Sequence, residues 1–356
     1  MTIALVGFPR SGKTTLFTLL TGAAVPAGRH DPRRAELHTG VARVPDPRLE
    51  RLAELFRPRP AVPATFEIVD VAGVAQGDRA RLDVPEVRGA DALLHVVRAF
   101  EDPVLGPPDA RRDIEALETE LVLADLELVE RRLERLVQAL RKRRVDAEVR
   151  EHALLGRLRA ALEAGTPLRA VALAPDEARL VRGFAFLSQK PILHLLNLPE
   201  RALADAPRAV AALAPLAERP QTRLAWVSAV IEAEIARLSG AEQRAFLAEL
   251  GLAEPAIHRV LRECYALLGL VSFFTVGDDE VRAWSVPRGT RAQDAAGVVH
   301  SDMARGFIRA EVVRYEDLVA AGSFAEARAR GQLRLEGKDY PVRDGDVCHF
   351  RFSVGR

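Results

Sequence analysis

The segment Gly7-Phe8-Pro9-Arg10-Ser11-Gly12-Lys13-Thr14 fits the pattern G-x-x-x-x-G-K-[ST] and directly follows the apolar residues 2–6. A buried strand that ends on such a loop and leads into a helix is the context in which this motif binds phosphate. The glycines let backbone N–H groups wrap the β-phosphate, the lysine bridges the β- and γ-phosphates, and the threonine holds Mg²⁺. The segment therefore predicts a nucleotide site formed by Gly7, Pro9, Arg10, Ser11, Gly12, Lys13, Thr14 and Thr15.

A second phosphate-site pattern follows the predicted strand 64–69, which ends on Asp70-Val71-Ala72-Gly73. This D-x-x-G arrangement is typical of GTPase-like switch loops. The Asp70 carboxylate is expected to hold a metal-bound water, and the Gly73 N–H is expected to face the γ-phosphate. Thr14 and Asp70 are thus the predicted Mg²⁺ residues.

The predicted strand 191–196 ends on Asn197-Leu198-Pro199-Glu200, where guanine-specific P-loop proteins carry N-K-x-D. The lysine is absent, and Glu200 is one methylene longer than the aspartate that accepts hydrogen bonds from guanine, so adenine becomes acceptable. Asn197 could serve N7 of the base, and Ser228-Ala229 would supply backbone near its edge. A plain strand-to-helix turn is the alternative. The pocket interpretation predicts ATP as the ligand, with GTP also admitted.

The remaining strand patterns, 92–97 and 223–227, alternate with helical segments, which favours an α/β fold with a parallel-rich sheet. We assign residues 1–112 and 166–270 to this P-loop domain, with residues 23–48 expected to be loop. Leucine and valine recur at spacings of 3 and 4 between residues 126 and 140 and again between 155 and 162. This predicts an inserted α-helical hairpin over 113–165.

Charges are sorted along the hairpin: residues 113–130 hold seven acids and no bases, and residues 131–144 hold seven bases and one acid. That order complements the helix dipole. Two interpretations stay open. The hairpin is either a solvated coiled coil that packs only on itself, or an arm whose tip, Arg141-Lys142-Arg143-Arg144, touches phosphates.

Beyond residue 271 the patterns become strand-rich, which predicts a separate mixed domain over 271–356. The net charge of +1 does not demand nucleic acid, and no DNA specificity is evident. Cys264 and Cys348 lack metal-ligand spacing and fit a reducing compartment. No signal peptide or bilayer-spanning run is found, so we expect a cytoplasmic protein with no membrane contact.

With these residues in view, the chain resembles the YchF or Obg-like ATPases, P-loop proteins of the GTPase superfamily, over nearly its whole length. The resemblance is carried by residues 7–17, 39–53, 70–73, 118–121, 197–200, 283–284, 306–311 and 335–340. It implies a G domain, the inserted hairpin, and a C-terminal β-grasp (TGS) domain. It also implies ATP preferred over GTP, with a ribosome or RNA as a partner.

The chain departs from the family pattern at the phosphate end of the site. Arg10-Ser11 replaces Asn-Val, Arg34 stands where a switch threonine is expected, and no histidine occurs in 103–107. No catalytic residue can be assigned from the sequence. We therefore expect a nucleotide-binding switch protein that hydrolyses ATP slowly with Mg²⁺ and engages the translation machinery. The alternatives are a nucleotide-sensing scaffold with negligible turnover and a small-molecule P-loop kinase, although the C-terminal segments argue against the kinase.

Overall fold

The computed structural model describes residues 1–23, 37–56, 60–71, 84–277 and 279–353. Two compact units divide the chain. The first contains Met1–Gly40 and Glu67–Leu267, and the second contains Val41–Phe66 and Leu268–Arg356. Within the described ranges, no helix is long and apolar enough to cross a membrane.

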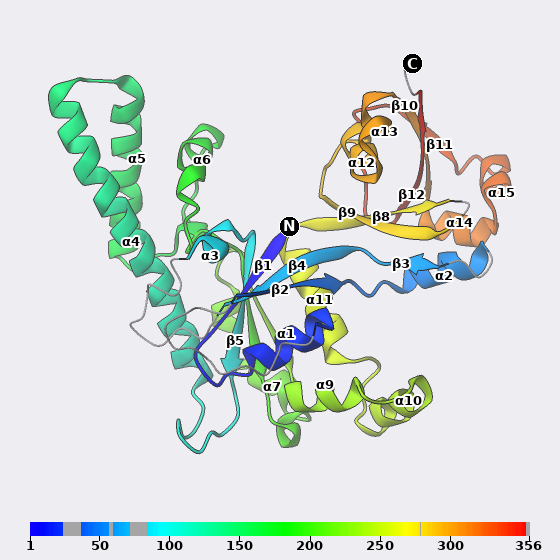
Figure 1. Ribbon diagram of the computed structural model, residues 1–356, viewed down its shortest axis with the longest axis horizontal. Coiled ribbons are helices and arrows are strands. Elements are labelled where there is room, and N and C mark those ends of the chain that lie inside the picture. The colour runs from blue at the N-terminus through cyan, green and yellow to red at the C-terminus, as the bar shows by residue number, and fades with distance from the viewer. Residues whose placement is uncertain (24–36, 57–59, 72–83, 278, 354–356) are drawn as a thin grey trace. The chain divides into compact units, whose positions relative to one another are not determined.

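The first sheet has six strands in the order β2-β4-β1-β5-β6-β7 (Figure 1). β1 pairs in parallel with β4 and β5, β5 with β6, and β6 with β7. β5 and β6 are buried along their whole length, because helices cover both faces of a parallel sheet. The strand bounds are β1 Thr2–Val6, β2 His38–Arg43, β4 Thr65–Asp70, β5 Ala92–Arg98, β6 Ile192–Asn197 and β7 Thr222–Val227.

The predicted helical hairpin is formed by α4 (Ala110–Lys142) and α5 (Asp146–Glu163), which run side by side (Figure 1). Their leucines and valines build a buried cluster that includes Val129, Leu136, Leu155 and Leu158. The spacing of 3 and 4 puts these side chains on one face of each helix, so each helix buries its stripe against the other. The other helices of this unit are α1 Lys13–Thr21, α3 Pro85–Gly89, α6 Pro175–Val181, α7 Ala206–Ala211, α8 Ala214–Ala217, α9 Ala229–Ile235, α10 Gly240–Glu249 and α11 Ala256–Leu267.

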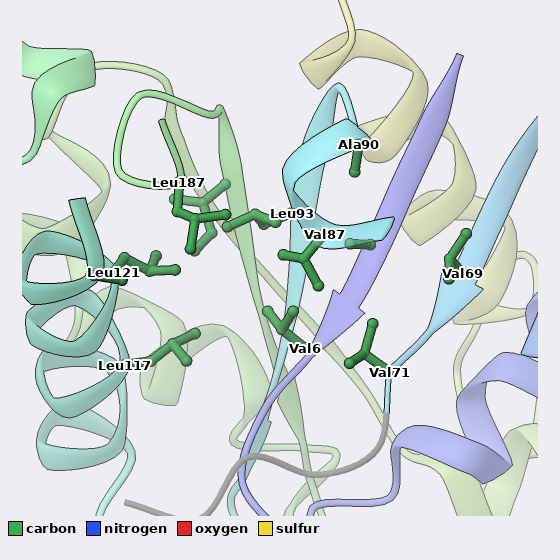
Figure 2. Close-up of a cluster of buried hydrophobic side chains, with 12 residues drawn as sticks. Val6, Val69, Val71, Val87, Ala90, Leu93, Leu117, Leu121 and Leu187 are labelled. Carbon is green, nitrogen blue, oxygen red and sulfur yellow. The ribbon is translucent and has the colours of Figure 1, made fainter. Parts of the chain in front are cut away.

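The base of α4 belongs to the core of the first unit. Figure 2 shows Leu117 and Leu121 of α4 pointing toward Leu187, in the loop before β6, and Leu93 of β5, and the same buried cluster continues to Val6 of β1. All five side chains are almost fully buried. The hairpin is therefore anchored through its first turns next to the strand that leads into the P-loop.

The second unit has a mixed sheet in the order β11-β10-β12-β8-β9-β3. β12 pairs with β8 in parallel, whereas β10 pairs with β12 and β8 with β9 in the antiparallel sense. Alanines of α12 pack on the apolar face of this sheet, the arrangement of a β-grasp domain. The bounds are α2 Pro47–Leu55, β3 Ala61–Val62, β8 Leu270–Val276, β9 Val281–Pro287, α12 Ala292–Val299, α13 Ser301–Arg305, β10 Phe307–Arg314, α14 Tyr315–Ala321, α15 Phe324–Ala329, β11 Arg334–Glu336 and β12 Asp346–Phe352.

The expectation of loop over residues 23–48 is wrong for 38–43, which form β2, and for the start of α2. Residues 24–36, including Arg34, lie outside the described residues. The α2 start carries a recognisable signal, since Asp46 caps it by accepting a hydrogen bond from the Arg48 N–H and Pro47 follows at the first position. Val41–Phe66 group with the C-terminal residues, although the sequence alone placed them in the P-loop domain.

Candidate functional site

The P-loop joins β1 to α1, and its backbone accepts only glycine at two positions. Gly7 has φ 148°, and a Cβ there would lie 2.6 Å from the Val96 carbonyl oxygen. Gly12 has φ 95°, and its Cβ would lie 2.3 Å from Nδ2 of Asn197. Side chains at these positions would collide with neighbouring strands, so the glycines allow the loop to curl over the ends of β5 and β6.

Lys13 is buried at the first position of α1, and its ammonium is turned onto the P-loop. Nζ donates to the carbonyl oxygens of Gly7 and Phe8, each at 3.0 Å. Burial lowers the pKa of Lys13 to about 8, and the nearby Asp70 carboxylate opposes that shift. The loop thus holds a partly desolvated cation at its centre, which is the charge needed by a phosphate group.

Thr14 and Asp70, the two residues that the sequence predicts to hold Mg²⁺, lie close together. Oγ1 of Thr14 is 3.4 Å from Oδ2 of Asp70, and Oδ1 of Asp70 is buried without a partner among the described residues. Burial raises the pKa of Asp70, while Lys13, His38 and Thr14 oppose the rise. A hydroxyl and an uncompensated carboxylate oxygen are hard donors that fit Mg²⁺, which takes few protein ligands and fills its shell with water and phosphate oxygens. Gly73 lies outside the described residues.

Asn197 ends β6 and connects two loops of the site. Its Nδ2 donates to the Ser11 carbonyl at 3.0 Å, and its Oδ1 accepts from the Ala229 N–H at 3.0 Å. The side chain is 4% exposed. Asn197 therefore fastens the P-loop to the start of α9, a role that the sequence analysis did not foresee.

The neighbouring residues that the sequence assigned to a base pocket differ in their exposure. Leu198 is buried and its N–H donates to the Val227 carbonyl, whereas Glu200 is exposed at the first position of a 3₁₀ turn, Glu200–Ala202. Ser228 is buried, and no described residue partners its hydroxyl. The structure thus brings Ser11, Asn197 and the residues 228–229 together, whereas the Glu200 side chain is exposed to solvent.

Arg10 has an ion pair that sequence reasoning missed. Its Nε donates to Oδ2 of Asp102 at 2.7 Å. Asp102 lies in the loop between β5 and α4, and Oδ1 of the same carboxylate accepts from the N–H groups of Val104 and Leu105. Pro9, Thr14 and Thr15 are exposed, as is Arg10. No sequence signal linked positions 10 and 102, because the pair depends on how the two loops meet.

A buried polar chain under the P-loop was also not predicted. Nδ1 of His95 lies 2.9 Å from Nδ1 of His194 on the neighbouring strand, and Nε2 of His194 lies 3.3 Å from Glu118 of α4. Glu118 is also paired with Arg169. Burial lowers the pKa of both histidines, whereas the pKa of Glu118 falls to about 2 because its partners outweigh burial. The register that places both histidines side by side was available only from the sheet.

A parallel sheet with a glycine loop, a buried lysine and a hydroxyl–carboxylate pair at its carboxyl edge defines a P-loop nucleotide-binding protein of the GTPase type. Family comparisons agree. A model described as a 50S ribosome-binding GTPase matches residues 2–134, and YchF-GTPase_C, described as a protein of unknown function, matches residues 270–353.

Whole-chain comparisons are more specific. The chain is 41% identical to the ribosome-binding ATPase YchF of Bacillus subtilis, covering 99% of this chain and 100% of that protein. It is 33% identical to Obg-like ATPase 1 of rice, covering 99% and 92%. The solved YchF GTPase of Schizosaccharomyces pombe matches with a TM-score of 0.84 at 28% identity, covering 99% and 97%. The chain belongs to the YchF family, which confirms the resemblance.

Proposed function

We propose that the protein binds ATP with Mg²⁺, hydrolyses it slowly and acts as a nucleotide-dependent switch on the ribosome. The P-loop carries the proposal, because Gly7 to Thr14 form a closed loop around the Lys13 ammonium and lead into a helix N-terminus. Bound phosphate would take the two hydrogen bonds that Lys13 now gives to the Gly7 and Phe8 carbonyls.

The base pocket supports adenine. Leu198 is apolar and buried, so this position offers no cation beside the base. Glu200 is exposed on a short turn and is longer than the aspartate of guanine-specific sites, so it does not enforce the contact to guanine. Asn197 can donate its second Nδ2 hydrogen to N7, which both purines share. GTP is therefore admitted as a weaker ligand.

Thr14 and Asp70 would hold the metal. When bound, Mg²⁺ neutralises charge on the phosphate oxygens. The chain's own contribution is to keep one hydroxyl and one carboxylate at the end of β4 and the start of α1, 3.4 Å apart. Gly73 is proposed to donate its backbone N–H to the γ-phosphate.

Hydrolysis should be slow, because Val74 follows Gly73 in the sequence, where a water-orienting glutamine would be needed. We expect single-turnover rates on the order of 10⁻⁴ to 10⁻³ s⁻¹ without a partner. A rate near zero, with ATP binding intact, would favour the nucleotide-sensing scaffold instead.

Calorimetric titration of Mg·ATP into wild type and Lys13→Ala tests the site. Lys13→Ala removes the buried cation, and charge-assisted hydrogen bonds contribute about 1.5–3 kcal/mol each, so affinity should fall at least about 100-fold. Lys338→Ala, the loss of an exposed lysine in the second unit, is the matched control. Equal affinity of wild type and Lys13→Ala for ATP would refute the nucleotide site.

The ribosome is the proposed partner because relatives such as the Bacillus subtilis protein are named for ribosome binding, and the hairpin offers an exposed basic tip, Arg141–Arg144. Such a tip suits ribosomal RNA phosphates and would make binding dependent on salt. Co-sedimentation with ribosomes, comparing wild type with alanine at these four positions, tests this partner. This role implies a cytoplasmic location.

A further inference from the structure

The backbone of Arg10 occupies a conformation that non-glycine residues rarely adopt. Its φ is +63°, one of three such values outside glycine within the described residues, and the other two are Ala185 and Gln221. Residues in this region of conformational space concentrate at functional sites, where the surrounding structure holds them. Arg10 lies three positions before Lys13, inside the loop proposed to wrap the phosphates.

Asp102 binds the Nε–H group of the Arg10 guanidinium. The Asp102 carboxylate is 7% exposed, and its Oδ1 is held by the N–H groups of Val104 and Leu105 at 2.8 and 3.0 Å. Its Oδ2 accepts the Arg10 Nε–H at 2.7 Å. These three donors lower the pKa of Asp102 to about 2, so the carboxylate is charged at every working pH. The orientation of the Asp102 carboxylate is thus set by its own loop, and the Arg10 guanidinium is positioned against that carboxylate.

The Nη1 and Nη2 groups of the same guanidinium are available to a ligand. Arginine carries five N–H donors, and the bond to Asp102 uses only the Nε–H. Across the described part of the chain, no other residue is bonded to Arg10, and its side chain is 53% exposed. The Nη1 and Nη2 edge has the fork geometry that binds two phosphate oxygens at once.

We propose that Arg10 is a second phosphate-binding cation of this P-loop, contacting the bound nucleotide through Nη1 and Nη2, and that Asp102 is its positioning residue. The inference rests on the proposed nucleotide site and deepens it. Lys13 supplies a buried point charge, whereas Arg10 supplies a planar, exposed fork whose direction Asp102 sets. Two other roles are outcomes of the test: Asp102 withholds Arg10 from the ligand, or the pair only fastens two loops.

Mg·ATP titration of Arg10→Gln, Arg10→Lys and Arg51→Gln tests the first half. Because Arg10 is half exposed, we expect Arg10→Gln to weaken ATP binding about 3- to 20-fold and to reduce its dependence on salt, with partial recovery in Arg10→Lys. Arg51 is the control, since its side chain is 55% exposed and pairs with Glu54 on the surface of the second unit. Unchanged affinity and salt dependence in Arg10→Gln would overturn the proposal.

A double-mutant cycle tests the positioning role. Asp102→Asn keeps an oxygen for the Val104 and Leu105 N–H groups but presents no charge to Arg10. We expect it to weaken ATP binding in wild type and to have no further effect in Arg10→Gln, because Asp102 acts through Arg10. Equal losses in both backgrounds would show a purely structural pair, and tighter binding in Asp102→Asn would show a withheld arginine. Either result would overturn the inference.

The proposed function can fail separately. If Lys13→Ala binds ATP as tightly as wild type, the nucleotide site itself is wrong. If Lys13→Ala loses ATP while Arg10→Gln keeps it, only the Arg10 inference fails.

Discussion

Raising the pH from 7 to 9.5 should weaken ATP binding through Lys13. Without nucleotide, burial lowers the pKa of Lys13 to about 8, so the ammonium loses its proton across this range. A bound triphosphate is strongly negative and raises the pKa of an adjacent ammonium. Nucleotide therefore binds the protonated form of Lys13, so affinity is near its maximum at pH 7 and falls as the pH rises through 8.

The size of the effect follows from the fraction of Lys13 that is protonated. With a pKa of about 8 in the free protein, and a value above the working range in the complex, affinity falls about tenfold per pH unit above 8. The total loss between pH 7 and 9.5 is about 30-fold, or about 2 kcal/mol. Below pH 7 this residue contributes no further change, because it is already protonated.

Calorimetry with saturating Mg²⁺, at five pH values and in two buffers of different ionisation enthalpy, measures both affinity and proton uptake. At pH 8 to 9 we expect wild type to take up a substantial fraction of one proton per ATP bound. Lys13→Arg, which cannot lose its proton in this range, should show no uptake. Affinity constant within twofold from pH 7 to 9.5, or equal uptake in Lys13→Arg, would refute the reasoning.

Three further outcomes follow from the same contacts. Leu198→Lys with Glu200→Asp should shift preference toward GTP, as measured by competition between the two nucleotides, and unchanged preference would show that these positions do not face the base. Asn197→Ala should lower the free energy of unfolding by about 1–3 kcal/mol, because it leaves the Ser11 carbonyl and the Ala229 N–H without their partner. Urea unfolding can be followed at Trp226 in a Trp284→Phe background. Lowering the pH from 7 to 5.5 should cost wild type about 1–2.5 kcal/mol more than the double variant His95→Asn, His194→Asn, since both histidines have lowered pKa values and only the unfolded chain takes up their protons below about 6.5. Equal pH slopes in the two proteins would contradict this.

Local patterns predicted the elements that lead into the site. The apolar run before Gly7, the leucine spacing of the hairpin and the apolar segments of β5 and β6 are each specified within a few residues of chain. β2 was not, because His38–Arg43 contains few strongly apolar side chains and is a strand through its pairing in the sheet. β8 was not predicted either, for a different reason. It follows α11 within one continuous apolar run, and hydrophobic periodicity does not separate the helix from the strand.

The burial and the partners of the charged side chains were the least predictable feature of the fold. The acids of residues 113–130 were interpreted as a helix-dipole pattern, yet Glu118 and Asp125 are buried. Asp125 accepts the N–H groups of Leu187 and Ser188 at 2.9 and 2.7 Å, and Glu118 pairs with Arg169. Their partners lie 50 or more residues away along the chain, so only the assembled fold distinguishes them from solvated neighbours.

The P-loop is held from several directions without any ligand contact. Asn197 binds the Ser11 carbonyl, and Asp102 binds Arg10. The Val96 carbonyl oxygen and the Asn197 side chain lie so close to Gly7 and Gly12, respectively, that a Cβ at either position would clash. Ordering this loop therefore costs little when phosphate binds, because folding has already ordered it. The main exchange on binding is made by Lys13, which must leave the Gly7 and Phe8 carbonyls for phosphate oxygens. The trade is favourable because a charged acceptor replaces two neutral ones, and it depends on the proton that Lys13 holds below pH 8.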